Sequence, residues 1–181
     1  MTYTRTAFRG AHLVTLLSVV CLLVAPCLAL AQPQAAPSAE EMVEQLKVKP
    51  QAPRTRSLRN LSVEAVEPVK PSLSLQIQFD FNSARVLPES QQALINLAQA
   101  MQSRELADVK FAVEGHTDAK GRADYNLKLS EQRAHAVSAV LASHGVTMAR
   151  LAAVGKGASE PANAADPLAA ENRRVRIVNL N

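Results

Sequence analysis

An acidic and a basic side chain frame the stretch from Glu114 to Val137, which reads EGHTDAKGRADYNLKLSEQRAHAV. Asp118 falls where a predicted strand ends, and Arg133 falls inside the helix predicted to follow it. A guanidinium binds a carboxylate through two parallel hydrogen bonds, and an aspartate accepts from an ammonium group. Directed toward one pocket, the pair could clamp both charged ends of an amino acid. The alternatives are an internal Asp118–Arg133 salt bridge, or Asp118 as a turn former and helix cap.

Three side chains along the predicted strand suggest a second chemistry. Glu114, His116 and Asp118 alternate in the sequence, so they could share a face and ligate a metal. No second histidine lies nearby, because His135 and His144 fall later, on the predicted helix. We therefore expect neither a metal nor a cofactor.

The chain also lacks the sequence signatures of common catalytic sites. It contains no Gly-x-Ser-x-Gly elbow, no phosphate-binding loop and no HExxH pair. No nucleophile and base stand at a spacing that would support catalysis. We predict that the protein is not an enzyme.

Hydrophobic periodicity indicates the elements that position these residues. Strands are predicted over 109–116, 151–154 and 174–178, with a turn-rich insertion over 155–167 that begins with a Gly-Lys-Gly tight turn. A first strand over 73–81 alternates, with its apolar face formed by Leu73, Leu75, Ile77, Phe79 and Phe81.

Two main helices complete the predicted framework. The first follows Pro88, and the second runs from about Arg122 to a cap at Gly145. Its predicted inward face carries Leu127, Ser130, Ala134, Val137 and Leu141. The pattern predicts an α+β fold in which two main helices pack on one face of a mixed, roughly four-stranded sheet, in the order β-α-β-α-β-β.

Several spaced motifs in this region agree with one another. They are G-H-T-D-x-x-G from Gly115, Y-N-x-x-L-S-x-x-R-A from Tyr125, a Gly-x-Gly at Gly155 and N-R-R-V-x-I from Asn172. Together they resemble the OmpA-like C-terminal domain, a periplasmic peptidoglycan-binding module, over residues 73–181.

The resemblance implies a ligand-binding site. In that family the aspartate of HTD and the arginine of LSxxRA bind the diaminopimelate residue of the peptide stem, which assigns this role to Asp118 and Arg133. It also makes pocket members of Asn126 from YNxxLS, Asn82 after the first strand, and Arg174 from NRRV. Their structural alternatives are, in turn, a helix-start cap, a turn residue and a surface strand charge.

Residues 1–31 have the order of a cleavable secretory signal: two arginines, an apolar run and small residues before Gln32. Cleavage there would release the mature chain into the periplasm. Both cysteines, Cys21 and Cys27, lie in this segment, so the predicted mature protein has none. Lipidation of a cysteine is one alternative. An uncleaved membrane anchor is another, because the apolar run approaches spanning length.

Residues 32–72 read as a linker rich in proline and alanine, in which the prolines block long helices. Ser38 and Glu41 form a possible capping box before the apolar Met42. We expect a fraying helix in a tether here, and not a helix docked on the domain. The arginines that begin at Arg54 are closely followed by acidic residues, which favours a solvated face.

These features predict noncovalent binding of peptidoglycan through diaminopimelate, anchoring the envelope or an outer-membrane or envelope partner to the cell wall. We expect a periplasmic, wall-associated protein, with a tether to the outer membrane as an open alternative. The rival function is an interaction scaffold in a motor or secretion apparatus, without wall binding. Nucleic acid is not an expected partner, because the charges of residues 73–181 nearly balance and aromatic residues make up only 3% of the chain.

Overall fold

The computed structural model describes residues 36–48 and 70–181, so the predicted signal segment and the arginines from Arg54 lie outside the described part. Within it, no helix has the length and apolar character needed to cross a membrane. The helices are α1 (Ala39–Leu46), α2 (Gln91–Met101) and α3 (Ala123–Ser143). The strands are β1 (Ser72–Leu75), β2 (Phe111–His116), β3 (Leu151–Gly157) and β4 (Val175–Asn179).

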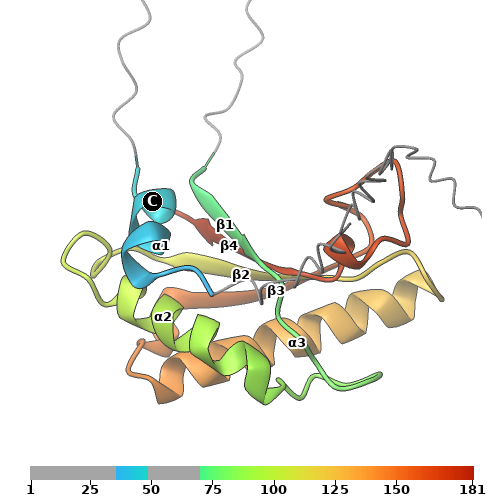
Figure 1. Cartoon of the computed structure of the whole chain (residues 1–181), viewed down its shortest axis with the longest axis horizontal. Coiled ribbons are helices and arrows are strands. Elements are labelled where there is room, and N and C mark those ends of the chain that lie inside the picture. The colour runs from blue at the N-terminus through green and yellow to red at the C-terminus, as the bar shows by residue number, and fades with distance from the viewer. Residues whose placement is uncertain (1–35, 49–69) are drawn as a thin grey trace, which may run out of the picture. The chain divides into compact units, whose positions relative to one another are not determined.

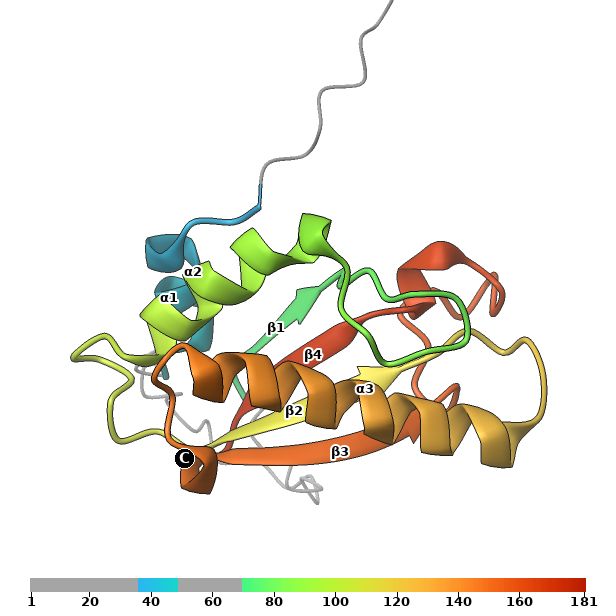
Figure 2. The same cartoon turned by 90° about the horizontal axis from the view of Figure 1, so that it is seen from below.

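The strands form one sheet in the order β1-β4-β2-β3. β4 runs antiparallel to both β1 and β2, whereas β2 and β3 are parallel and are connected by α3. Helices α2 and α3 lie on the same face of this sheet (Figure 1, Figure 2). The predicted α+β fold with a mixed four-stranded sheet is confirmed.

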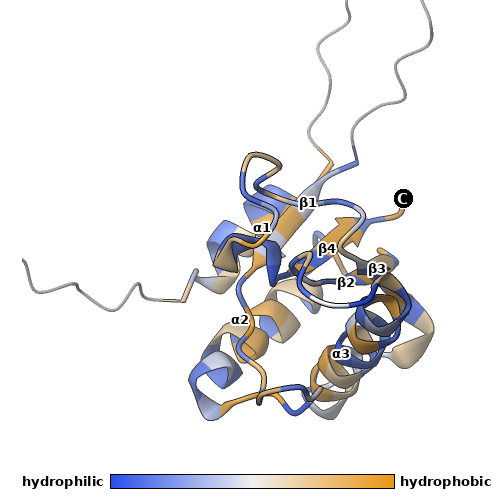
Figure 3. Cartoon of the chain, turned by 90° about the vertical axis from the view of Figure 1, so that its right-hand side faces the viewer, coloured by the Kyte–Doolittle hydropathy of each residue, from blue (hydrophilic) through white to orange (hydrophobic). Residues whose placement is uncertain are grey.

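The core lies between the sheet and the helices. Leu73 of β1, Val113 of β2 and Ile177 of β4 are at most 4% exposed, because alternation along each strand turns them toward the helices. Apolar and polar residues both occur along α2 and α3 in Figure 3, as amphipathic helices require. The predicted apolar positions of α2 are all buried: Leu94, Leu97, Ala98 and Met101.

Helix α3 approaches the sheet very closely at two glycines. A Cβ on Gly115 would lie 2.1 Å from the Ser130 carbonyl oxygen, and one on Gly155 would lie 2.7 Å from that of Leu127. The backbone of Leu127, and not its side chain, therefore faces β3, and its side chain is 51% exposed in contrast to the prediction. The rest of the predicted inward face is buried, namely Ser130, Ala134, Val137 and Leu141.

The Gly-Lys-Gly sequence that was expected to form a turn is part of β3 instead. Gly155 pairs with Gly115 of β2, and Gly157 pairs with His116 after a register shift. The glycines are required there by the close approach of α3, which explains why a glycine pair does not end the strand.

The first strand is shorter than its alternation predicts. β1 ends at Leu75, and Phe79 forms an isolated antiparallel bridge with Val86. Between them the chain reverses at Asn82, whose φ of 52° is in the left-handed region. The reversal takes Phe81 out of the alternation, so this residue is 99% exposed and the prediction of a buried side chain is wrong.

Helix α1 is docked on the domain, which corrects the expectation of a fraying helix. Met42 and Leu46 are completely buried and belong to the same apolar cluster as α2 and β1. Ser38 and Glu41 form the predicted capping box, and Asn179 Nδ2 donates to the Leu46 carbonyl at 2.8 Å. The two apolar residues four positions apart give this short helix one face, and α2 and β1 cover that face.

Candidate ligand-binding site

Asp118 lies in the loop that joins β2 to α3. Its Oδ1 accepts a hydrogen bond from the Lys120 amide at 3.1 Å, and its Oδ2 pairs with Arg173 Nη1 at 2.9 Å. The Asp118 side chain is 17% exposed. One carboxylate oxygen therefore shapes the loop, while the other meets a cation from the segment before β4.

Asn126 fastens this loop to the first turns of α3. It is buried, and its Nδ2 donates to the carbonyls of Asp118 at 3.2 Å and of Lys120 at 3.0 Å. These bonds fix the backbone that carries the Asp118 carboxylate. The contacts of Asn126 thus support the loop.

Arg133 lies about two turns further along α3 and is half-buried. Its guanidinium carbon is 4.8 Å from the centroid of the Phe79 ring, and its Nε donates to the Ser83 carbonyl at 3.0 Å. Burial lowers the pKa of Arg133 from its usual value, whereas Tyr125 and, more weakly, Asp118 raise it. Among the described residues, its two terminal nitrogens make no hydrogen bond and no ion pair.

Asp118 and Arg133 are near neighbours without being partners. The charge of Asp118 influences the pKa of Arg133, yet no ion pair within 4.0 Å joins them in the part of the chain that the structure describes. Asp118 pairs with Arg173 instead, so the structure does not contain the internal salt bridge that was an alternative for these two residues. Their role in holding a ligand stays a prediction.

Asn82 is brought to the same region by the turn it forms. Its Oδ1 accepts a hydrogen bond from the Tyr125 hydroxyl of α3, and the next residue, Ser83, offers its carbonyl to Arg133. The turn after β1 and the start of α3 are therefore joined at two points. A shallow depression of about 410 Å³ adjoins them on α3 and shares Tyr125, but neither Asp118 nor Arg133 lines it.

Arg174 does not join this group. It is buried, and its Nη2 donates to the Glu160 carbonyl at 3.0 Å. Its neighbour Arg173 is the residue that reaches Asp118. Successive side chains of an extended segment point to opposite sides, so the two arginines of the NRRV motif separate. The sequence supplies both arginines but not the side to which each points.

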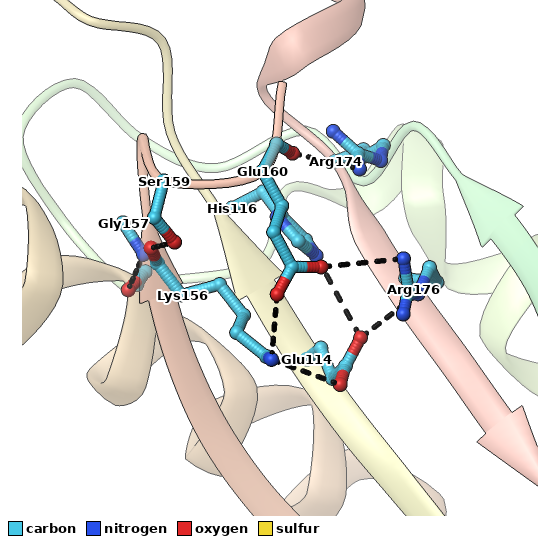
Figure 4. A network of polar contacts seen from close by, with 9 residues as sticks. Glu114, His116, Lys156, Gly157, Ser159, Glu160, Arg174 and Arg176 are labelled. Carbon is cyan, nitrogen blue, oxygen red and sulfur yellow. Dashed lines mark hydrogen bonds and ion pairs between the residues drawn. The ribbon is translucent and has the colours of Figure 1, made fainter. Parts of the chain in front are cut away.

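Arg174 belongs to a charged cluster on the sheet face opposite to α2 and α3 (Figure 4). The members of this cluster are Glu114, His116, Lys156, Glu160, Arg174 and Arg176. Burial, reinforced by the neighbouring arginines, lowers the pKa of His116 to about 4. Within residues 36–48 and 70–181, no group of three histidine, cysteine or acidic side chains is placed to hold a metal.

The profile of the OmpA family matches residues 78–175 of the chain. Over 105 residues the chain is 42% identical to outer membrane porin F of Pseudomonas fluorescens. The aligned region covers 57% of this chain and 32% of the porin. Over 108 residues it is 37% identical to the outer-membrane lipoprotein YfiB of Pseudomonas aeruginosa, covering 59% of this chain and 63% of the lipoprotein. The chain thus spans less than two thirds of either relative.

Among solved structures, the periplasmic domain of MotB from Helicobacter pylori aligns with a TM-score of 0.51 and 24% identity. The alignment covers 60% of this chain and 74% of that domain. At this level of identity the likeness shows a shared fold.

Proposed function

Because this chain belongs to the OmpA family, we propose that it binds peptidoglycan noncovalently through the diaminopimelate of the stem peptide. In this role it anchors the envelope, or a partner protein, to the cell wall. The family assignment confirms the resemblance that the motifs predicted. The proposal places the protein in the periplasm and includes no catalytic step, metal or cofactor. The outer-membrane names of porin F and YfiB support an envelope setting.

The observation that carries the proposal is the state of Arg133. Its Nε and its ring-stacking face are occupied by Ser83 and Phe79, so the guanidinium is held in place. Its two terminal nitrogens, which form the fork that fits a carboxylate, have no partner among the described residues. A donor fork that is already ordered loses little conformational entropy on binding.

The second half of the proposed clamp is the Asp118 carboxylate. A free amino-acid centre of diaminopimelate carries an ammonium and a carboxylate on one carbon, which suits an acid and a base in adjacent positions. Asp118 Oδ2 now pairs with Arg173, whose side chain is 49% exposed. Such a half-exposed pair contributes only about 0–1 kcal/mol, so an ammonium group can share or replace it.

Isothermal titration with a soluble diaminopimelate-containing stem peptide tests the clamp. We expect Arg133→Ala and Asp118→Asn to weaken binding by roughly 10- to 150-fold, the effect of losing one charge-assisted contact. The asparagine keeps an oxygen that can accept from the Lys120 amide, so the loop is preserved. Arg104→Ala is the matched control, because it removes an exposed cation outside the site.

The peptide should also protect the wild-type domain against heat, by about 2.7 kcal/mol at a concentration of 100 Kd. Neither site variant should be protected to that extent. Unchanged affinity in a folded Arg133→Ala protein would defeat the assignment. Failure of the wild type to bind either the peptide or purified sacculi would instead favour the interaction scaffold.

A further inference from the structure

The segment between β3 and β4, residues 158–173, which we call the excursion, is held to the sheet through one acidic residue. Glu160 Oε1 pairs with Lys156 Nζ at 2.8 Å, and its Oε2 pairs with Arg176 Nη1 at 3.4 Å. The Glu160 carbonyl accepts from Arg174 Nη2 at 3.0 Å. Three cations from β3 and from β4 and its approach thus converge on a single residue of the excursion (Figure 4).

Glu114 of β2 orients two of these cations from below. Its Oε2 lies 2.9 Å from Arg176 Nε, and its Oε1 lies 3.7 Å from Lys156 Nζ. The Glu114 side chain is 10% exposed, whereas those of Lys156 and Arg176 are 29% and 31% exposed. With Glu114 as their only acidic partner the three cations would leave a net charge of +2, and Glu160 reduces it to +1.

The far part of the excursion is tied to the loop of the candidate site. The Ala119 amide donates to the Pro167 carbonyl at 3.0 Å. Asn172 is completely buried, and it bonds to the Asn163 amide and to the Asp166 carbonyl, each at 2.9 Å. Residues 163–172 of the excursion are therefore tied to one another by hydrogen bonds.

Arg173 follows directly after this ordered body and reaches Asp118. We propose that Glu160 is a positioning residue that binds Lys156, Arg174 and Arg176, an arrangement that we call the clasp, and thereby sets where Arg173 meets Asp118. Glu160 has no contact with the candidate site itself and acts on ligand affinity through Arg173. This inference rests on the proposed function for its effect on affinity, but not for its effect on the excursion.

His116 lies beneath the clasp, and the charged groups around its ring are those that form the clasp. The ring is 2% exposed, and neither ring nitrogen has a hydrogen-bond partner among the described residues. The hydrogen bond with Lys156 lowers the pKa of Glu160, so this carboxylate stays ionised at neutral pH. The charged groups that face His116 come from β2, β3, β4 and the excursion, and are Glu114, Lys156, Glu160, Arg174 and Arg176.

Amide hydrogen exchange on the ligand-free chain tests the clasp directly. In Glu160→Gln, which keeps the size of the side chain and removes its charge, we expect the Ala119 amide to exchange roughly tenfold faster. The Val113 amide in the core should be unaffected. Glu171→Gln is the matched control, because it neutralises an exposed acid of the same excursion that has no ion pair among the described residues. Unchanged exchange at Ala119 in Glu160→Gln would overturn the proposal.

A double-mutant cycle tests whether Glu160 affects ligand affinity through Arg173. Because Arg173 shares the Asp118 carboxylate with the ligand ammonium, Glu160→Gln should change stem-peptide affinity by roughly 2- to 30-fold in the wild type. In an Arg173→Ala background it should have almost no further effect, because the residue it positions is gone. Simple additivity would show that Glu160 does not act through Arg173. Absence of peptide binding in the wild type would defeat the proposed function, while the exchange measurement would still decide the clasp.

Discussion

The two ends of the sheet differ in how completely their polar groups are used. At the end where β2 and β3 begin, Arg150 donates from Nε to the Val109 carbonyl at 2.9 Å. Its Nη2 donates to the carbonyls of Met101 at 2.8 Å and Leu106 at 2.6 Å. At the end where β2 and β3 finish, Arg133 makes one hydrogen bond and leaves its terminal nitrogens without partners among the described residues.

Other properties of the two arginines are alike. Arg150 lies 5.7 Å from the centroid of Phe111, as Arg133 lies 4.8 Å from that of Phe79. Burial lowers the pKa of both guanidinium groups. Stacking, burial and a lowered pKa therefore do not separate a structural arginine from a candidate ligand-binding one. The number of unused donors does.

If the end of the sheet where β2 and β3 begin mainly stabilises the fold, the largest loss of stability should come from the apolar contacts at that end. Leu46→Ala removes a completely buried side chain of α1 and should cost about 2–5 kcal/mol. Urea denaturation measures the loss, and affinity for the stem peptide should not change. A chain that starts at residue 72 should be destabilised at least as much. Full stability in that truncated chain would show that α1 contributes nothing to the domain.

At the other end, stability should depend on pH through His116. Its pKa is about 4 in the folded chain and near 6.5 when unfolded, so between these values the unfolded state binds more protons. Stability should therefore fall as the pH drops from about 6.5 to about 4, by up to about 1.4 kcal/mol per pH unit. His116→Gln should reduce this slope in denaturation curves measured across the window. Exposed His135→Gln should keep the wild-type slope.

Exchanging the two arginines for a residue of similar length sharpens the contrast. Arg150→Met should cost about 1–3 kcal/mol, because buried carbonyls at the end of α2 lose their donors, and it should leave affinity unchanged. Arg133→Met should weaken peptide binding and change stability by less than Arg150→Met. Equal losses of stability in the two variants would remove the distinction between the ends.

The smallest effect is expected at Phe81. Its side chain is 99% exposed, so Phe81→Ala should change the free energy of unfolding by no more than about 0.5 kcal/mol. Phe79, two residues earlier, is partly buried against the core and stacks on Arg133. Phe79→Ala should therefore destabilise the domain measurably in the same denaturation experiment. A large loss of stability in Phe81→Ala would contradict the exposure of this side chain.

Elements with a strong period, and motifs with several fixed spacings, were predictable from the sequence. The two main helices, the sheet and the neighbourhood of Asp118 and Arg133 belong to this group. Docking of α1 was not predictable, because the apolar residues Met42, Val43 and Leu46 define a face but not the surface that covers it. The exposure of Phe81 depends on the left-handed turn at Asn82, which breaks the alternation on which the prediction relied.

The choice between Arg173 and Arg174 required the register of β4 against β2. Both arginines belong to one motif, and both are common ligands for anions. The pairing of Gly115 with Val175 fixes which of them faces the loop that carries Asp118. Sequence spacing alone contains no such information.

The order of α1 before β1 has a mechanical consequence. A pull applied to the chain upstream of residue 38 reaches the sheet only after it has loaded the contacts of α1, because Met42 and Leu46 are seated in the core. Once α1 is peeled away, tension is transmitted to β1 by the chain between Leu46 and Ser72, whose fully extended span is at most roughly 90 Å. The docked helix would then detach first, so a sudden displacement would undock α1 while the sheet and the candidate site stay intact.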